Sequence, residues 1–548
     1  MKKLLVILLS VVMAFATTAA LTACDKKADN SGGVISDAGN KTDDNGGTTS
    51  GDDKTDGNGG TTSDDGKTDD NESGGSGGEQ GDLGETTDDG EKYVDSKGLS
   101  FDLTKDGTGV ICKRIGECKD KILVIPAEFG GRPVVEIADQ AFRQVDFITK
   151  AVIPDSVTKI GEYAFADCGS LINLVIGKGV LSIGNGAFSS NKFLSDVTLP
   201  DKLETIGENA FSFDYSLKTI TIPKTVTDIG DYAFSGCSAL TNIKVEEGNA
   251  NYLSKDGNLY SKDGKTLIQY AAGKPETSFT IPTGVKTIGC GAFRKCAALK
   301  TITNTANVTT IGSGAFSGCA ALESFTIPST VTEIGYSWFS GCKALKSITI
   351  PAQVKTIAEL AFASCESLKS ITIPDKVSLI GNFAFASSGL TEVTIPDSVT
   401  DVGESAFFSC KSLIKVTLGS GVKTISQSMF FGCTALTSFV VPDGITEIGG
   451  MAFLGCTALK SVTVSKTVQF IKTQAFQDCT ALDEFKIFVG DNSLQVQDLI
   501  FLNCSKLKNI DYFGTTEQCA NTRLQYYLEY NSSVKTITCS NGTITVNA

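Results

Sequence analysis

The sequence predicts a solenoid, a stack of about fifteen 23-residue coils with parallel β-strands and little regular helix, preceded by a disordered N-terminal linker. Three observations lead to this fold class. An Ala-Phe pair recurs at a spacing of 23 residues, and short stretches of each unit alternate apolar and polar residues. The segment 24–92, in contrast, has almost no apolar side chains.

The N-terminal segment, residues 1–23, has the features of an export signal. Two lysines are followed by an apolar run from Leu4 to Ala20 and by small residues before Cys24. The stretch "LTAC" resembles the bacterial lipobox, which implies that Cys24 is the lipid attachment residue and that cleavage occurs before it. An ordinary signal peptide and an uncleaved anchor are the alternatives. A lipidated Cys24 predicts stable attachment to the outer face of the cell membrane.

Residues 24–92 are expected to form an acidic linker rich in Gly, Asp and Thr. From Asp25 to Glu91 there are 19 acidic residues and five lysines, a net charge of −14 that equals the net charge of the whole chain. Such a composition cannot bury enough apolar surface to fold. Its Asp-Gly runs also lack the ligand spacing of an EF-hand calcium loop. The acidity therefore indicates a solvated spacer and says nothing about a partner of the folded part.

A phenylalanine marks each unit of the repeat region, residues 142–510. The markers are Phe142, Phe165, Phe188, Phe211, Phe234, Phe293, Phe316, Phe339, Phe362, Phe385, Phe407, Phe430, Phe453, Phe476 and Phe501. The spacing is 23 residues except for single steps of 59, 22 and 25. Because one such unit cannot bury its own apolar face, the units must stack into a continuous core.

Each unit contains two short extended segments. In "LKSITIP", residues 345–351, apolar and polar residues alternate as in a half-buried strand, and Pro351 ends the pattern. A second alternating segment follows at residues 354–357. Parallel strands of neighbouring coils lie ~4.8 Å apart, so each repeated position is expected to form a column along the stack.

The repeat "C-x-x-L-x-x-I-x-I-P-x-x-V-x-x-I-x-x-x-A-F" closely resembles the BspA-type leucine-rich repeats of surface proteins from bacteria and some parasitic protists. The resemblance covers residues 93–548. It identifies residues 93–141 as an N-terminal capping coil and residues 511–548 as a C-terminal capping segment, where the family often has Trp and this chain has Cys519. It implies a leucine-rich-repeat-like solenoid that mediates adhesion, or binding of proteins or glycans, through an extended β-sheet face.

The 59-residue step predicts a hairpin insertion at about residues 246–282. Asp263 and Gly264 lie between "NLYS" and "KTLIQY", and an Asp-Gly pair between two alternating runs is a strong hairpin signal. We interpret the segment as an elongated coil with a protruding hairpin. Two interpretations of this hairpin remain open: it is a purely structural insertion, or it is an element that binds a partner.

The repeated cysteines have three possible roles: catalytic thiols, metal or disulfide ligands, and small residues that fill the wall of the coil. Most lie three residues after a marker, a position that also holds Val145, Asn191, Asp214 and Ser388. This mixture favours selection for size and local fit, and therefore a column of buried, reduced cysteines. Disulfides remain open, the favoured pairs being Cys112–Cys118, Cys290–Cys296 and Cys519–Cys539.

The chain contains no histidine. This excludes zinc sites that use histidine as well as Ser-His-Asp and Cys-His catalysis. We therefore expect no catalytic residues, no metal site and no cofactor. We also expect no interaction with nucleic acid. A hydrolase that uses paired carboxylates, as glycosidases do, is the enzymatic alternative.

The candidate binding face lies on the outward side of the first extended segment of each unit. Its residues are Thr303, Thr326, Ser347, Thr349, Thr372, Thr394 and Thr417. Threonine also suits exposed strand positions for purely structural reasons. We interpret the face as a contact surface for host extracellular matrix or cell-surface proteins, glycans or other cells, on a monomer that is lipid-anchored at the cell surface. A passive structural or shielding protein of the cell envelope is the alternative.

Overall fold

The computed structural model describes residues 93–304, 307–490, 494–531 and 533–546. The described residues all belong to one unit of the chain, Gln80–Ala548. The predicted signal peptide, residues 1–23, the lipid attachment residue Cys24 and the linker, residues 24–92, lie outside the described residues.

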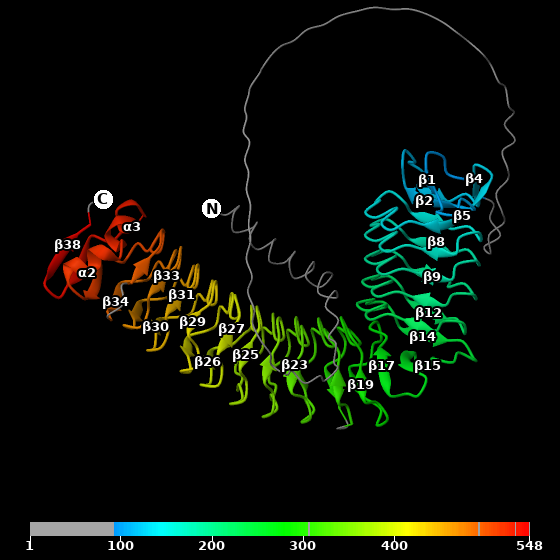
Figure 1. Cartoon of the computed structure of the whole chain (residues 1–548). Coiled ribbons are helices and arrows are strands. Elements are labelled where there is room, and N and C mark those ends of the chain that lie inside the picture. The colour runs from blue at the N-terminus through cyan, green and yellow to red at the C-terminus, as the bar shows by residue number, and fades with distance from the viewer. Residues whose placement is uncertain (1–92, 305–306, 491–493, 532, 547–548) are drawn as a thin grey trace, which may run out of the picture. The chain divides into compact units, whose positions relative to one another are not determined.

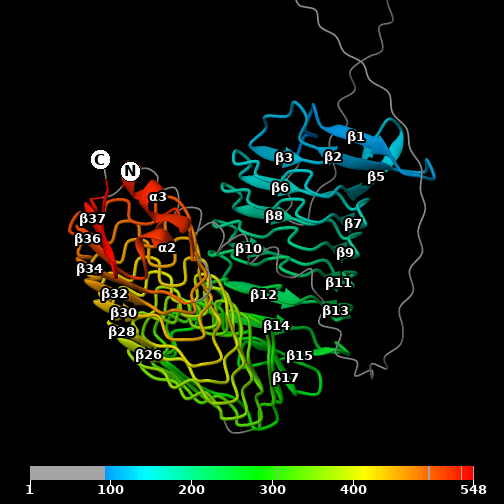
Figure 2. The same ribbon diagram turned by 60° about the vertical axis from the view of Figure 1, so that its left-hand side comes forward.

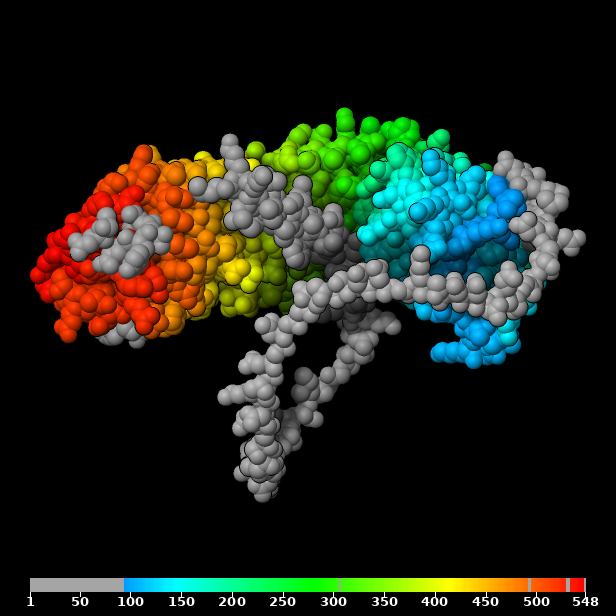
Figure 3. Space-filling view, turned by 90° about the horizontal axis from the view of Figure 1, so that it is seen from above, coloured from blue at the N-terminus to red at the C-terminus, as the bar shows by residue number. Residues whose placement is uncertain are grey.

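The described residues form the predicted β-solenoid, with about 18 coils and almost no helix (Figure 1). Successive coils pair in parallel, as in the register Ile334 to Ile357 to Ile380, one repeat apart at each step. The colour bands of Figure 3 follow the chain order along the stack. Each coil is therefore covered by its neighbours in sequence, as expected for repeats that cannot bury their own apolar face.

One side of the stack, the first-strand side, carries the strand that precedes the repeated proline position (Figure 2). Its strands are β3 (Ile122–Val124), β6 (Lys150–Val152), β8 (Asn173–Val175), β10 (Asp196–Val197), β12 (Thr219–Ile222), β14 (Asn242–Val245), β18 (Ser278–Thr280), β20 (Thr301–Thr303), β22 (Ser324–Phe325), β26 (Glu392–Thr394), β28 (Lys415–Thr417), β30 (Ser438–Val440), β32 (Ser461–Val464), β34 (Glu484–Phe488), β36 (Asn509–Phe513), β37 (Thr536–Cys539) and β38 (Gly542–Thr545). They form the sheets β10-β8-β6-β3, β12-β14, β18-β20-β22, β26-β28 and β30-β32-β34-β36-β37-β38.

The second-strand side carries the strand after that proline, together with strands of the N-terminal cap and the insertion. Its strands are β1 (Ser100–Leu103), β2 (Val110–Arg114), β4 (Glu128–Phe129), β5 (Arg132–Ile137), β7 (Lys159–Ile160), β9 (Ser182–Ile183), β11 (Thr205–Ile206), β13 (Asp228–Ile229), β15 (Tyr252–Lys255), β16 (Asn258–Ser261), β17 (Thr266–Gln269), β19 (Thr287–Ile288), β21 (Thr310–Ile311), β23 (Glu333–Ile334), β24 (Thr356–Ile357), β25 (Leu379–Ile380), β27 (Asp401–Val402), β29 (Thr424–Ile425), β31 (Glu447–Ile448), β33 (Phe470–Ile471) and β35 (Gln495–Val496). The sheets are β1-β2-β5-β7-β9-β11-β13 with β4 beside β5, β15-β16-β17-β19-β21, β23-β24-β25-β27 and β29-β31-β33-β35.

The segment that most plainly suggested a first strand does not form one. Residues 345–350 and their equivalents 368–373 contain no strand, so the first-strand side is interrupted between β22 and β26. Their central inward residues, Ile348 and Ile371, are only partly buried, whereas the equivalent Val393 of β26 is buried. The two coils remain joined on the second-strand side, where β24 pairs with β25. The alternating pattern therefore predicts which way the side chains point but not the hydrogen bonding.

The turn around each marker forms a third hydrogen-bond ladder. In one coil the amides of Leu360, Phe362 and Ser364 donate to carbonyls of the next coil at 3.0, 2.7 and 2.7 Å. The intervening amides of Ala361 and Ala363 donate to carbonyls three residues back, at 3.3 and 3.1 Å. Every amide of this turn is thus satisfied, as a buried backbone requires.

This ladder depends on an unusual backbone conformation. The residues two before and two after the marker have positive φ, for example 59° at Leu360 and 57° at Ser364. Such a conformation costs a residue with a side chain about 1–2 kcal/mol. The cost recurs from the first marker coil, with Gln140 at 58°, to the last, with Asn503 at 63°. The inter-coil hydrogen bonds offset it, because in most marker coils the two positive-φ residues each donate one of them, as Leu360 and Ser364 do.

The markers form the centre of the core. All fifteen are at most 1% exposed, and the rings of successive markers stack with centroids 4.8 to 5.9 Å apart on either side of the long step. The core consists of two clusters, one within residues 99–259 and one within residues 260–546. The long step therefore divides the core as well as the repeat.

Within the long step, Tyr270 takes the place of a marker that the sequence pattern hides. Its amide donates to the carbonyl of Ala292 at 2.9 Å, as marker amides do, and its ring lies 5.4 Å from that of Phe293. The Asp263-Gly264 turn joins β16 and β17, which pair antiparallel. This hairpin is built into the stack instead of protruding freely, because Leu259 and Leu267 are buried in the core and β17 pairs in parallel with β19.

The C-terminal cap contains two short helices, α2 (Thr516–Asn521) and α3 (Leu524–Asn531). Thr515 caps α2 through a capping box with Gln518, in which each side chain accepts from the other residue's backbone amide. Cys519, which stands where the resemblance suggested Trp, is the buried residue of α2. Among the described residues, no helix is long and apolar enough to cross a membrane.

Candidate functional site

All seven residues of the candidate binding face are exposed on the first-strand side. They are Thr303, Thr326, Ser347, Thr349, Thr372, Thr394 and Thr417. The structure places Thr303 beside Thr280 and Thr394 beside Thr417 in strand register. Ser347, Thr349 and Thr372, however, lie in the interruption between β22 and β26. The face is thus an exposed column of hydroxyls supported by separate short sheets, and not by one continuous sheet.

Charged side chains flank this column and partly neutralise one another. Lys346 lies 2.6 Å from Glu323 in the preceding coil, and this hydrogen bond from the ammonium group lowers the pKa of the carboxyl of Glu323. Lys343 lies 2.9 Å from Glu366 in the following coil. These pairs are exposed, so each contributes little to stability.

Sequence reasoning missed the apolar residues at the C-terminal end of the same face. Val440 of β30 stands in the threonine column and is 68% exposed. Phe488 of β34 and Phe513 of β36 stand where most coils have proline, are 43% and 50% exposed, and stack at 4.4 Å. Their departure from the repeat consensus is the signal that could have identified them.

The position three residues after each marker, here called the slot, has a polar role that its composition did not reveal. The thiol of Cys342 donates to the carbonyl of the preceding marker, Phe316, at 3.2 Å, and accepts from the backbone amide of Cys319. The side-chain amide group of Asn191 likewise donates a hydrogen bond to the backbone carbonyl of Phe165 at 3.0 Å. The slot therefore favours a small side chain that both donates and accepts hydrogen bonds, which refines the prediction of a size-selected filler.

The thiols of the slot are unsuited to nucleophilic chemistry. Burial raises the pKa of Cys410 to about 11 and that of Cys456 to about 12. They are therefore protonated near neutral pH, whereas a nucleophile or a metal ligand needs the thiolate. All sixteen cysteines among the described residues are free, including the pairs Cys112–Cys118, Cys290–Cys296 and Cys519–Cys539.

Acidic and sulfur ligands do not gather elsewhere in the described part of the chain. Within it, no group of three or more His, Cys, Asp or Glu residues is arranged to hold a metal ion. Carboxylates of the described residues do form ion pairs with lysines, such as Lys346–Glu323 and Lys486–Glu484, and these pairs are exposed.

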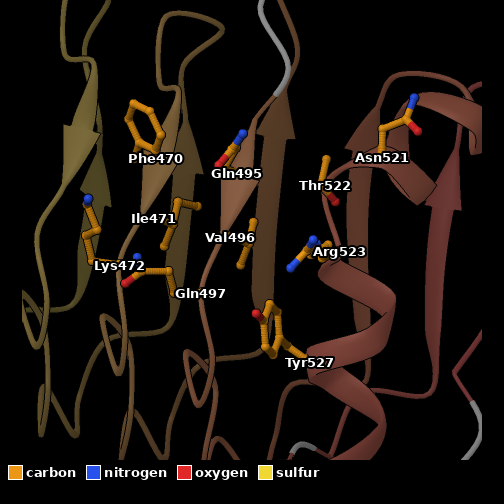
Figure 4. Close-up of a pocket in the computed structure, with 10 residues that line it drawn as sticks. All are labelled: Phe470, Ile471, Lys472, Gln495, Val496, Gln497, Asn521, Thr522, Arg523 and Tyr527. Carbon is orange, nitrogen blue, oxygen red and sulfur yellow. The ribbon is translucent and has the colours of Figure 1, made fainter. Parts of the chain in front are cut away.

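A pocket of about 360 Å³ lies between the last strands of the second-strand side and the C-terminal cap (Figure 4). Phe470, Lys472, Gln495 and Gln497 line one wall from β33, β35 and the residues after them. The opposite wall consists of Asn521, Thr522, Arg523 and Tyr527, and Figure 4 shows Arg523 reaching from the cap toward Val496 of β35. Nothing in the repeat pattern indicated this pocket, because it forms where the pattern ends.

Several solved structures of bacterial leucine-rich repeat proteins are similar to this chain. One from Eubacterium ventriosum is 25% identical, with 74% of this chain and 93% of that chain covered and a TM-score of 0.36. One from Bacteroides ovatus is 24% identical, with coverage of 82% and 99% and a TM-score of 0.38. A leucine-rich cell surface protein from Faecalibacterium prausnitzii is 23% identical, with coverage of 78% and 97% and a TM-score of 0.35.

A search of curated proteins found no significant match. The family model of the BspA-type leucine-rich repeat region, in contrast, matches residues 135–256, 272–390, 378–508 and 446–548. These ranges cover more than half of the chain and coincide with the coils, and the parallel pairing and the marker turn recur through them. This chain is thus a member of the family of BspA-type leucine-rich repeat proteins.

Proposed function

We propose that this chain is a lipid-anchored binding protein of the bacterial cell surface that holds its partners on the first-strand side. The partners would be host extracellular matrix or cell-surface proteins, glycans or other cells. The observation that carries the proposal is the exposed column of hydroxyls together with the exposed aromatic pair, Phe488 and Phe513, at its C-terminal end.

The chemistry of this face suits adhesion. Hydroxyl groups at regular intervals can donate and accept hydrogen bonds along an extended partner. Aromatic residues are enriched in protein interfaces relative to the rest of the surface. In the register of β34 and β36, Lys486 lies beside Asp511 and Phe488 beside Phe513, so charged and apolar contacts are available next to each other.

Membership of a family of surface repeat proteins supports a location at the cell surface. The lipid anchor itself rests on "LTAC" and Cys24, outside the described residues. Cys24→Ala should move the full chain from the membrane fraction to the soluble or secreted fraction and abolish labelling with a fatty-acid analogue. Continued lipid labelling of this variant would refute the assignment of Cys24.

The binding proposal is tested with the full chain in detergent micelles, applied to immobilised fibronectin, laminin and collagen, to a glycan array and to epithelial cells. We expect saturable binding to at least one of them that unlabelled protein competes. The double variants Thr349→Glu/Thr394→Glu and Phe488→Ser/Phe513→Ser should each weaken binding at least tenfold, because the first adds charge to the face and the second removes its apolar contacts.

The matched control is Thr332→Glu/Thr424→Glu, which adds the same charge at exposed positions outside the first-strand side. It should bind as the wild type does. If no surface binds the chain, while deletion of the gene weakens the cell envelope, a passive structural role replaces the adhesive one.

A further inference from the structure

The two sides of the solenoid end differently at the C-terminus. The first-strand side continues from β34 through β36, β37 and β38 and closes with an antiparallel pair. The second-strand side stops at β35. After β36 the chain enters α2 and α3 in place of another second strand, so one rung is missing from the sheet β29-β31-β33-β35.

The missing rung leaves backbone acceptors without donors. In the preceding coil, the carbonyl of Gln469 accepts from the amide of Gln495 at 2.8 Å, and that of Ile471 accepts from the amide of Gln497 at 2.9 Å. The register of β33 and β35 makes Val496 the equivalent of Ile471.

One residue earlier, Leu494 is the equivalent of Gln469. The carbonyls of Leu494 and Val496 accept no hydrogen bond from any residue that the structure describes. A strand at the edge of a sheet is a template for pairing with another chain. We therefore expect the edge of β35 either to be covered by other parts of the protein or to pair with a strand from a binding partner.

The 360 Å³ pocket lies directly beside this edge, with Val496 in its lining. Across it, the guanidinium group of Arg523 has no ion pair or side-chain hydrogen bond within the described part of the chain. The other cation of the pocket, Lys472, is already 3.6 Å from Glu447. The pocket thus combines one backbone acceptor of this edge, the carbonyl of Val496, with the bidentate cationic donor Arg523, and the second acceptor, the carbonyl of Leu494, lies on the same edge beside the pocket.

We propose that this pocket binds an extended peptide segment that carries a carboxylate, as an additional parallel rung on β35. Two alternate peptide amides donate to the carbonyls of Leu494 and Val496, and the carboxylate accepts from Arg523. Addition of a strand to an exposed sheet edge is an established mode of peptide recognition, with affinity from main-chain hydrogen bonds. The volume lies near the lower limit of ordinary ligand pockets, ~300–1,000 Å³, and therefore suits a short segment.

An acidic sugar is the competing occupant, because its hydroxyls and carboxylate could meet the same acceptors and the same cation. A peptide is favoured because the free carbonyls belong to a parallel ladder whose previous donors are two backbone amides, those of Gln495 and Gln497. This site lies on the second-strand side and is independent of the adhesive face proposed above.

The probe is a fluorescein-labelled hexapeptide, Gly-Ile-Thr-Glu-Ile-Gly, which copies the rung at residues 444–449. Fluorescence anisotropy with the full chain in detergent micelles should show saturable binding. We expect a loss of at least tenfold in affinity for Arg523→Gln and for the peptide with Gln in place of Glu. Gln is tolerated at this backbone, since Arg523 has φ 60° and Gln474 adopts the same angle.

Two controls separate this site from general charge and from sugar binding. Lys376→Gln removes an exposed positive charge outside the pocket and should bind the peptide as the wild type does. Peptides with N-methyl groups on alternate residues, in both registers, keep the side chains but lose amide donors, so one register should lose binding. This comparison uses the unmodified protein and does not depend on how any variant folds.

Three results would overturn the proposal: no saturable binding of the hexapeptide, equal binding of both N-methylated peptides, or unchanged binding by Arg523→Gln. Displacement of the peptide by millimolar glucuronic acid, together with N-methylated peptides that bind normally, would assign the pocket to an acidic sugar instead.

Discussion

The two clusters of the core differ in the side chains that occupy the slot, the position from which a side chain donates a hydrogen bond to the carbonyl of the preceding marker. In the cluster within residues 260–546 the slot holds cysteine in every marker coil except one, which has Ser388. In the cluster within residues 99–259 it holds, in chain order, Val145, Cys168, Asn191, Asp214 and Cys237. The exchange of thiol, hydroxyl, amide and carboxyl shows that the slot requires a small donor and acceptor, and that sulfur itself is not needed.

Asn191 shows how an amide fills the slot. Its side chain donates to the carbonyls of Phe165 and Phe188 at 3.0 and 2.6 Å and accepts from the amide of Cys168 at 2.9 Å. Val145, which cannot donate, belongs to the first marker coil, where no earlier marker offers a carbonyl. The exception therefore follows the same rule.

Asp214 is the most informative member of the comparison. Its Oδ1 accepts from the amide of Asn191 at 2.8 Å, whereas its Oδ2 is buried with no hydrogen-bond partner. Burial raises the pKa of this carboxyl well above its usual range. A protonated Asp214 carries the hydrogen that a thiol or an amide provides at this position in other coils.

The largest effect expected is the loss of a marker ring in either cluster. Phe188→Ala and Phe362→Ala should each lower the free energy of unfolding by about 3–5 kcal/mol, because each ring is fully buried between two stacked rings. Urea denaturation followed by circular dichroism measures both. A loss below about 1 kcal/mol in one cluster alone would show that the two cores are not packed alike.

The second prediction concerns the pH dependence of the cluster that contains Asp214. Because the folded state raises the pKa of this carboxyl, the native protein holds a proton that the unfolded chain releases near pH 4. The stability contributed by this proton is complete below that pH and is lost as the pH rises toward the folded pKa.

Asp214→Asn should therefore be more stable than the wild type at pH 7, with the difference shrinking toward pH 4. Thermal unfolding between pH 4 and pH 8 measures it, and Asp201→Asn, at an exposed position, is the control. A variant that is less stable than the wild type at every pH would show that Asp214 is not a protonated member of the slot.

The sequence was sufficient for the features that repeat. A spacing of 23 residues and one apolar face per segment predict the coils, the stacked markers and the exposed column from Thr303 to Thr417, because every coil meets the same neighbours. The turn at Asp263-Gly264 was also predictable, since an Asp-Gly pair suits the backbone of a hairpin.

The features that break the repeat were not predictable in the same way. The loss of the strand at 345–350 occurs in a segment that fits the consensus, so no residue signals it. The role of Tyr270 as a marker was not predicted because the pattern was defined by Phe. The role of Arg523 was not predicted because its pocket forms only where two helices end the repeat. Val440, Phe488 and Phe513 could have been found as departures from the consensus.

The smallest expected effects are those of substitutions in the slot, which test whether its side chain stabilises the fold through hydrogen bonds or through its size. Cys342→Val keeps the volume but removes the donor to the carbonyl of Phe316, which still accepts from the amide of Cys319 at 3.1 Å. The loss should therefore be about 1 kcal/mol. Cys342→Ser keeps both functions and should cost less than Cys342→Val, as the natural Ser388 suggests.

In the other cluster, Asn191→Val removes three hydrogen bonds and should cost more than Cys342→Val. Midpoints of urea denaturation rank all three variants against the wild type. If both valine variants match the wild type while the serine variant is less stable, the slot selects for apolar volume. If the costs instead follow the number of hydrogen bonds lost, one polar rule accounts for the slot in both clusters.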